Sequence, residues 1–201
     1  MDENMFEKYK DLLEQEGIES NTKLSQEWFF DRIREINKEQ VDRQSIMRNP
    51  PIRMAPNQFK GRMYLFRYNP VGRQKLPYFD RFPLVILLEL NKEGFMGLNL
   101  HYLPIDLRQR LFYNLLNRAS NPQFRWNTYL KIDYDYLKSR TQLRAYKACI
   151  KRYRYDQIYG RMANVPAPEW EVAVHLPLAS WRKAAESRVF KDSREIARKI
   201  T

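Results

Sequence analysis

The residues with the clearest potential for chemistry form a basic, tyrosine-rich stretch in the last third of the chain. Residues 138–161 contain eight basic side chains and one acidic one, so this stretch carries +7 of the formal net charge of +12. Lysine and arginine bind phosphate groups with release of counterions, which makes the affinity salt-dependent. Tyrosine rings can stack on unpaired bases. The predicted contacts to a nucleic acid or to an acidic partner are Lys138, Arg140, Arg144, Tyr146, Lys147, Lys151, Arg152, Tyr153, Arg154 and Arg161.

The spacing of these cations is compatible with a helix. If the stretch is helical, basic residues that recur every three or four positions share one side, and these are Arg140, Arg144, Lys147, Lys151 and Arg154. Three interpretations remain open: a surface that binds nucleic acid, a surface that docks on an acidic protein, and a solvated face that only improves solubility. The chain has no zinc-finger spacing, nucleotide-binding glycine fingerprint or RNA-recognition motif that would decide between them.

Histidine and cysteine chemistry is not expected. His101 and His175 lie in the apolar contexts Leu-His-Tyr-Leu-Pro and Val-His-Leu-Pro, which favour a core histidine with one hydrogen bond over a metal ligand. Cys149 is the only cysteine, so no disulfide framework or cysteine metal cage can be built, as in proteins of reducing compartments. Lys147 and Lys151 flank Cys149 and could lower its pKa, but a buried, unreactive thiol is the favoured interpretation.

A nuclease would need carboxylates that converge on a divalent ion. Asp80, Glu89 and Lys92 occur in a loosely similar order, but residues three apart in a strand point to opposite faces of the sheet. A second pair, Asp133 and Asp135, lies among tyrosines that favour packing. We therefore predict a protein that is not an enzyme, without catalytic residues, metal, cofactor or small-molecule substrate.

The composition predicts a folded, soluble domain. Hydrophobic residues make up 43% of the 201 positions and aromatic residues 14%, which is enough for a packed core. The longest apolar run, residues 84–88, is far shorter than the roughly 20 residues of a membrane span. The acidic start of the chain does not resemble a signal peptide, so no membrane partner is expected.

Hydrophobic periodicity predicts helices in the first quarter of the chain. Apolar residues recur at helical spacing over residues 3–16 and again from Ser25, the expected N-cap, to Ile36. Both helices are polar on the opposite side and can pack on the domain or on a partner. Residues 1–47 are therefore predicted to form an N-terminal helical arm. Residues 48–61 contain three prolines, which exclude a helix and predict an extended linker.

Residues 62–201 are predicted to form a core domain that includes a basic, tyrosine-rich segment at 129–161. Apolar and aromatic runs predict an antiparallel meander of three strands, over residues 63–68, 83–90 and 95–100. Asp80 and Arg81, in the apolar connection between the first two, are expected to be exposed. The later elements expected are a helix from Pro104 to Asn121, a strand over 170–176, and helices from Ser180 and after Asp192. The fold class is α+β: a small antiparallel sheet or open barrel flanked by helices.

Several of these segments resemble a family of small virion proteins of large contractile-tailed (myovirus) bacteriophages. The similar segments are residues 62–66, 76–85, 94–104, 146–153, 169–174 and 191–194. The resemblance covers about residues 60–195 and leaves out the N-terminal helices. The family is associated with DNA end protector proteins, which bind the terminus of packaged genomic DNA.

This resemblance implies a virion protein, assembled in the host cytoplasm, that covers the genome end at the head–tail junction without sequence specificity. The basic stretch would hold the phosphates of the DNA, and a tyrosine would stack on the terminal base pair. The alternative is a structural subunit of the phage tail, neck or baseplate that does not bind DNA. In that case the same cations would dock on acidic phage proteins, and residues 1–47 would be an interaction arm.

Overall fold

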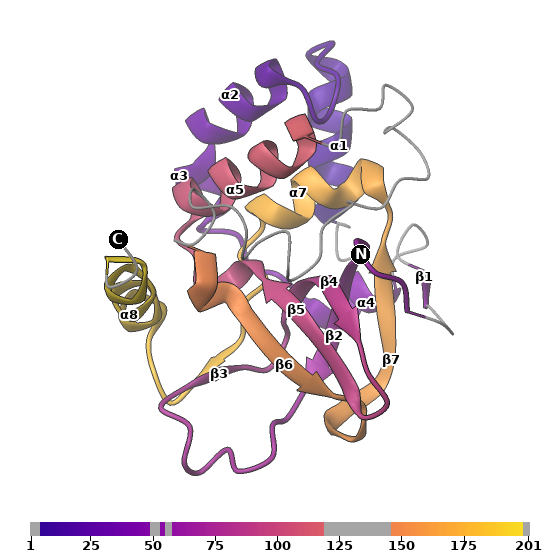
Figure 1. Cartoon of the computed structure of the whole chain (residues 1–201). Helices are drawn as coiled ribbons and strands as arrows, with labels where there is room; N and C mark the ends of the chain where they lie inside the picture. Colours follow the sequence, from indigo (N-terminus) through magenta and orange to yellow (C-terminus); the bar gives the residue numbers. More distant parts are fainter. Residues whose placement is uncertain (1–4, 49–52, 55–57, 119–145, 199–201) are drawn as a thin grey trace.

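The computed structural model describes residues 5–48, 53–54, 58–118 and 146–198. It confirms the α+β class: helices cover one side of an antiparallel sheet (Figure 1). The helices are α1 (Met5–Gln15), α2 (Lys23–Asp31), α3 (Ile33–Ile36), α4 (Arg43–Arg48), α5 (Ile105–Arg118), α7 (Trp170–His175) and α8 (Glu186–Arg198). The strands are β1 (Arg53–Met54), β2 (Met63–Tyr68), β3 (Phe79–Asp80), β4 (Leu84–Leu90), β5 (Gly94–Asn99), β6 (Ile150–Arg154), β7 (Ile158–Val165) and β8 (Trp181–Arg182).

The main sheet has the strand order β1-β7-β2-β4-β5-β6, and every pairing is antiparallel. The predicted meander is confirmed as β2, β4 and β5, with Asn91–Gly94 as the hairpin connection. Only the three residues of the 3-10 turn η4 (Tyr155–Gln157) join β6 to β7, although three strands lie between them. In a flat sheet their axes would be about 19 Å apart, but four Cα steps span at most about 15 Å. The sheet is therefore curled into an open barrel.

Two hydrophobic clusters stabilise the fold, one on each face of the sheet. Leu84, Ile86 and Leu88 of β4 pack in the cluster under the helices, whereas Val85 and Leu87 pack in the cluster inside the curl. Side chains of a strand alternate between the faces, so β4 can only be apolar along its length. This confirms the prediction of a strand buried on both sides.

The N-terminal helices pack against the sheet and the later helices. Phe6 of α1, Phe29 of α2 and Ile36 of α3 are fully buried in the cluster under the helices. The N-cap of α2 is Thr22, not the predicted Ser25, because Ser25 occupies the third position of a capping box with Thr22. The predicted second helix is divided at Arg32, which lies between α2 and α3.

The buried carboxylate of Glu171 in α7 connects this layer to the rest of the protein. It accepts hydrogen bonds from the backbone N–H of Asn21 at 2.7 Å, from the Ser25 hydroxyl at 2.8 Å and from the Tyr113 hydroxyl. Burial raises the pKa of Glu171 to about 7, against the lowering effect of the bonds from Asn21 and Ser25. The loop before α2, α5 and α7 therefore meet at one polar contact inside an apolar layer.

Two predictions for the C-terminal third were wrong. The segment predicted as a strand, residues 170–176, is the helix α7, and all six of its residues are buried. An element enclosed by protein on every side has no polar face, so its apolar pattern does not distinguish a helix from a strand. The two helices expected from Ser180 and after Asp192 are instead the short strand β8 and a single helix, α8.

Two glycines of β5 allow neighbouring strands to approach closely. A Cβ atom at Gly94 would lie 1.8 Å from the backbone oxygen of Tyr153, and one at Gly97 would lie 2.1 Å from a methyl group of Val85. We expect Gly94→Ala to lower the free energy of unfolding by about 3 kcal/mol or more, because the backbone of β6 has to move. Gly97→Ala should cost about 1–3 kcal/mol, because the Val85 side chain can adjust.

Urea denaturation of the two variants tests this ranking. The exposed Ser187→Ala in α8 is the control and should change the unfolding free energy by less than about 0.5 kcal/mol. If Gly94→Ala were no more destabilising than the control, the close approach of β5 and β6 would be contradicted.

Candidate nucleic-acid interface

The basic stretch predicted from the sequence is not a helix where the structure describes it. Lys138, Arg140 and Arg144 lie outside the described residues. From residue 150 to 165 the chain forms β6, η4 and β7, so the helical face proposed for these cations is wrong for this part. In a strand, side chains alternate between faces with a period of two.

The two tyrosines of the predicted site are part of the core. Tyr153 is 4% exposed, and its hydroxyl accepts a hydrogen bond from the side-chain amide of Asn99 at 3.0 Å. Its ring packs on Phe66 and Phe95. Tyr146 is also buried. Neither ring is exposed for stacking on a base.

The cations of this stretch differ in how freely they can meet a ligand. Lys147, Arg152, Arg154 and Arg161 are exposed. The two guanidinium groups of β6 already have acidic partners: Arg152 lies 3.4 Å from a Glu93 oxygen, and Arg154 lies 2.8 Å from an Asp156 oxygen. The ammonium of Lys151 lies 4.0 Å from the centre of the buried Tyr102 ring, so it faces the protein.

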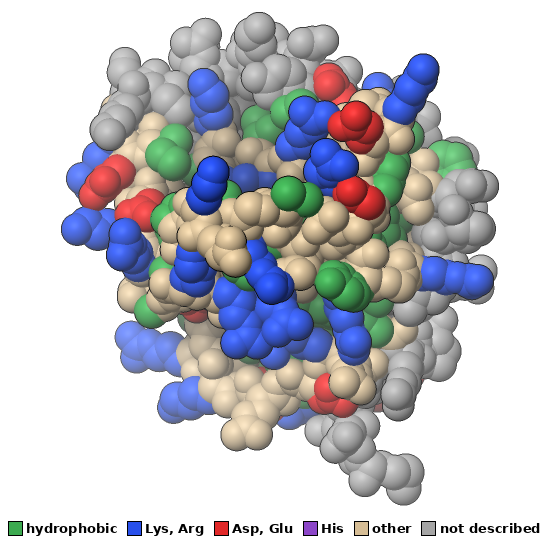
Figure 2. Space-filling view, turned by 90° about the horizontal axis from the view of Figure 1, so that it is seen from below, with side chains coloured by type: hydrophobic (Ala, Val, Ile, Leu, Met, Phe, Trp, Pro, Cys, Tyr) green, Lys and Arg blue, Asp and Glu red, His purple; other side chains and the backbone are tan. Residues whose placement is uncertain are grey.

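A different group of cations lines a pocket of about 860 Å³. Among the described residues, its walls include six basic side chains and no aspartate or glutamate: Arg43, Arg67, Arg73, Arg81, Arg182 and Lys183. The other lining residues are Gln44, Tyr68, Asn69, Gln74, Phe79, Phe82, Tyr159 and Ser180. Seen from below, one face of the protein shows lysine and arginine side chains gathered near its middle, with the acidic side chains apart from them (Figure 2).

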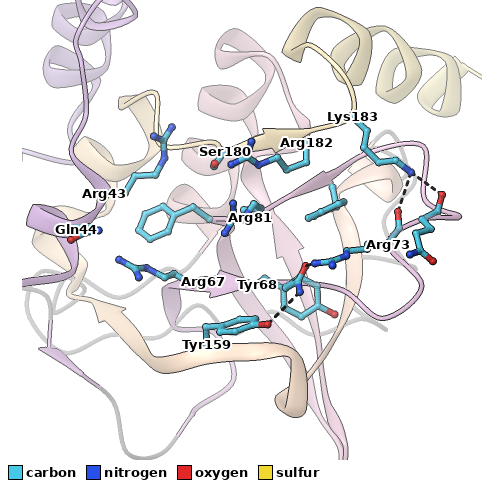
Figure 3. Close-up of a pocket in the computed structure, with 14 residues that line it drawn as sticks. Arg43, Gln44, Arg67, Tyr68, Arg73, Arg81, Tyr159, Ser180, Arg182 and Lys183 are labelled. Atoms are coloured by element: carbon cyan, nitrogen blue, oxygen red, sulfur yellow. Dashed lines mark hydrogen bonds between the residues drawn. The ribbon is translucent and has the colours of Figure 1, made fainter.

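The pocket is assembled from chain segments that are far apart in the sequence. In Figure 3, Arg67, Tyr68 and Tyr159 of the sheet lie on one side of the hollow, and Ser180, Arg182 and Lys183 lie on the other. Backbone hydrogen bonds join the segments: the Tyr68 N–H binds the Arg81 oxygen at 3.0 Å, and the Arg81 N–H binds the Ser180 oxygen at 2.9 Å. These bonds hold together the backbone segments from which Arg67, Arg81 and Arg182 extend.

Three of these arginines are free to bind an anion. Arg67, Arg81 and Arg182 are exposed, and none of them forms an ion pair with another of the described residues. Arg67 is the only exposed residue of β2, at a position where the pairing of β2 with β7 is irregular. Guanidinium groups bind phosphate with two parallel hydrogen bonds, so these three suit a phosphate chain.

The remaining cations also shape the walls of the pocket. The Lys183 ammonium donates to the backbone oxygens of Arg73, Gln74 and Leu76 at 2.7–3.0 Å. Lys183 has a φ of +71°, a strained conformation for a residue with a side chain, and these three bonds hold it. Arg43 donates to the backbone oxygens of Leu178 and Ala179. The loop 73–76 and the segment before β8 are thereby fixed.

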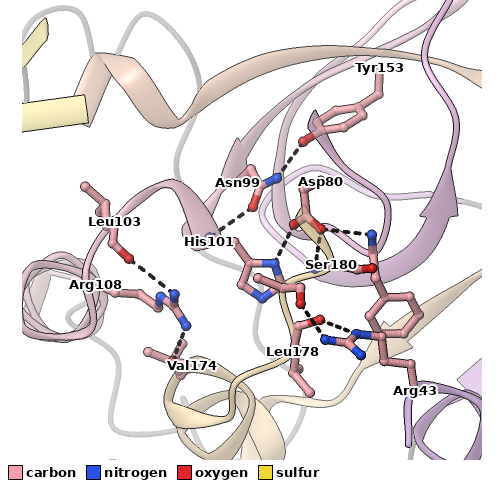
Figure 4. Close-up of polar contacts among 12 residues, drawn as sticks. Arg43, Asp80, Asn99, His101, Leu103, Arg108, Tyr153, Val174, Leu178 and Ser180 are labelled. Carbon is pink, nitrogen blue, oxygen red and sulfur yellow. Dashed lines mark hydrogen bonds and ion pairs between the residues drawn. The ribbon is translucent and has the colours of Figure 1, made fainter. Parts of the chain in front are cut away.

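The buried carboxylate of Asp80 binds the backbone of Ser180, one of the residues that line the pocket (Figure 4). Asp80 was expected to be exposed, but only 4% of its surface is accessible, because it satisfies buried donors from three segments. Its oxygens accept hydrogen bonds from His101 Nδ1 at 2.6 Å and from the backbone N–H groups of Phe82 and Ser180, both at 2.9 Å. Burial raises the pKa of Asp80, but His101 and the two N–H groups outweigh it, so the pKa lies below its ordinary value. Arg81, in contrast, is exposed as predicted.

The described residues contain no group of three or more histidine, cysteine or acidic side chains that could hold a metal ion. Asp80, one of the carboxylates that a nuclease would need, is bound to His101, and the pair Asp133 and Asp135 lies outside the described residues. Both histidines are fully buried, as predicted. Burial raises the pKa of Cys149 to about 12, so its thiol is protonated at neutral pH.

Charge density along the sequence did not reveal the pocket, because its cations are spread from residue 43 to residue 183. One local signal was present. Arg67 interrupts the otherwise apolar run of β2, and Arg81 follows Asp80 in a short polar interruption between Phe79 and Phe82. A lone arginine in such a run must reach solvent or a partner, and both of these line the pocket.

Comparison with known proteins places the chain in a family. No curated protein and no solved structure gives a significant match. Across the part that the structure describes, no helix is both long and apolar enough to cross a membrane. A family model described as the phage T4 terminal DNA protecting protein matches residues 3–194. The matched range is longer than the range of about residues 60–195 that carries the resemblance in the sequence, because it also includes the N-terminal helices. The chain therefore belongs to the phage T4 terminal DNA protecting protein family.

Proposed function

We propose that the protein binds the ends of the phage genome without sequence specificity, through the basic pocket, and that it does so in the virion at the head–tail junction. The family consists of phage proteins that protect DNA ends, so DNA is the expected partner. Other phage structural proteins at the junction are proposed as further partners. Binding alone is sufficient for protection, because a covered terminus is not accessible to an exonuclease.

The observation that carries this proposal is the charge of the pocket. Of the residues that the structure describes, six cations and no carboxylate line one hollow, whereas two exposed arginines of the 138–161 stretch face Glu93 and Asp156. Neutralisation of phosphates by unpaired cations is independent of sequence and dominates non-specific DNA binding. The exposed cations Lys147 and Arg161 could extend the contact along the DNA, as could Lys138, Arg140 and Arg144.

A salt series with two forms of one duplex tests the proposal. We expect linear DNA to bind more tightly than the same sequence as a covalently closed circle. The logarithm of the affinity should fall with the logarithm of salt concentration with a slope of about −3 to −5, as for three to six phosphate contacts. Equal binding of both forms would contradict end recognition. No binding at moderate salt would instead favour a structural subunit whose cations dock on acidic phage proteins.

A further inference from the structure

The size of the pocket limits which part of a DNA end can enter it. Its volume is about 860 Å³, within the range of about 300–1,000 Å³ of sites that enclose a drug-sized ligand. Double-stranded DNA is much larger, since its major groove alone is about 12 Å wide. A duplex can lie across the mouth of the pocket, but only a few nucleotides of one strand fit inside.

The lining residues suit unpaired nucleotides. Tyr159 is 60% exposed, and it lines the pocket together with the partly exposed Phe79. The side-chain amide of Asn69 lies 3.3 Å from the Tyr159 hydroxyl, and its oxygen accepts a bond from Arg73 at 2.9 Å. The ring is therefore held at its edge while its face stays open. Exposed rings next to cations are the usual platform for single-stranded nucleic acid.

We propose that the pocket holds the unpaired last nucleotides of one strand at the end of a duplex. Tyr159 stacks on a base, and Arg67, Arg81 and Arg182 bind the phosphates that follow it. Stacking accepts any base, so this mode of binding stays independent of sequence. The inference rests on the proposed function, because it assigns the pocket as the site that meets the DNA end.

Three probes with the same duplex sequence separate this inference from the proposed function. The first is a dumbbell closed at both ends by hairpins, the second a blunt linear duplex, and the third a linear duplex with three unpaired thymidines at each end, prepared with either polarity. Binding is measured by competition against one labelled duplex. We expect the protruding strand to bind at least about tenfold more tightly than the blunt duplex, as for one or two stacked bases.

The variant Tyr159→Ala should lose most of this tenfold gain, so that protruding and blunt ends bind it with nearly the same affinity. Phe30→Ala is the matched control, because Phe30 of α2 is 57% exposed and does not line the pocket; this variant should keep the gain. Equal affinity for blunt and protruding ends would overturn the inference, and so would an unchanged gain in Tyr159→Ala. Equal affinity for the dumbbell and for both linear duplexes would overturn end recognition as well, which is the proposed function.

Discussion

A variant with glutamine at Arg67, Arg81 and Arg182 is expected to bind DNA ends about 100- to 1,000-fold more weakly than the native protein at moderate salt. Hydrogen bonds to charged groups contribute about 1.5–3 kcal/mol each when well formed. About 1 kcal/mol or more for each of three partly solvated contacts gives this loss. The slope of the logarithm of affinity against that of salt should become shallower by about 2–3, since three phosphate contacts are removed. Fluorescence anisotropy over a salt series measures both quantities.

Two further variants with the same change in charge show whether the loss of affinity comes from the pocket or from the lower net charge. Lys10, Lys23 and Arg34 are exposed cations of the N-terminal helices, and their replacement by glutamine should reduce affinity by less than about threefold, because distant charges are screened. Replacement of Lys147, Arg152 and Arg154 tests the stretch predicted from the sequence. If that variant lost more affinity than the pocket variant, the pocket would not be the main DNA site. All three variants should have the same midpoint temperature of thermal unfolding as the native protein, because the replaced side chains are exposed.

The second large effect is expected at the buried carboxylate. Asp80→Ala should lower the free energy of unfolding by about 3–5 kcal/mol, because His101 and two backbone N–H groups would lose their shared acceptor inside the protein. The control is Asp156→Ala, which removes an exposed carboxylate paired with Arg154 and should cost far less, because exposed ion pairs contribute little to stability. Urea denaturation at neutral pH compares the two. Similar values would show that Asp80 does not hold the segments together.

The same carboxylate gives stability a defined dependence on pH. The pKa of Asp80 in the folded protein lies below its ordinary value of 3.8, so the unfolded chain binds a proton first as the pH falls. The contribution of the ionised group is therefore fully present above pH 3.8 and is lost as the pH falls through the lower, folded pKa. The difference in unfolding free energy between the native protein and Asp80→Asn should shrink below that pH. A difference that stayed constant down to pH 2 would contradict this assignment.

Some elements were predictable because a short local sequence pattern is enough to determine their structure. Residues 84–88 are apolar without interruption, and such a run is typical of a strand covered on both faces. Asn91–Gly94 has the composition of a hairpin turn, and Pro104 precedes the first turn of α5, where Asp106 faces the positive end of the helix dipole. In each case the sequence signal lies within the element itself and does not depend on residues far away in the chain.

The errors arise where the surroundings decide the structure. The segment of α7 alternates like a strand, but burial on all sides removes the polar face that would have shown its helical period. The β6 stretch has cations at near-helical spacing, yet Tyr153 between two exposed arginines packs into the curled sheet. The pocket was missed because its cations come from α4, β2, β8 and three loops, and only the tertiary fold brings them together.

The distances along the chain within the pocket also determine when it forms during folding. The Ser180 N–H binds a carboxylate 100 residues earlier in the chain, and Lys183 binds backbone oxygens 107–110 residues earlier. Closing a loop of this length costs about 4 kcal/mol of chain entropy, and contacts of such long range slow folding. The walls of the pocket should therefore meet late, after the sheet has formed. Partly folded chains would then not occupy DNA ends, and a bound end would stabilise only the completed protein.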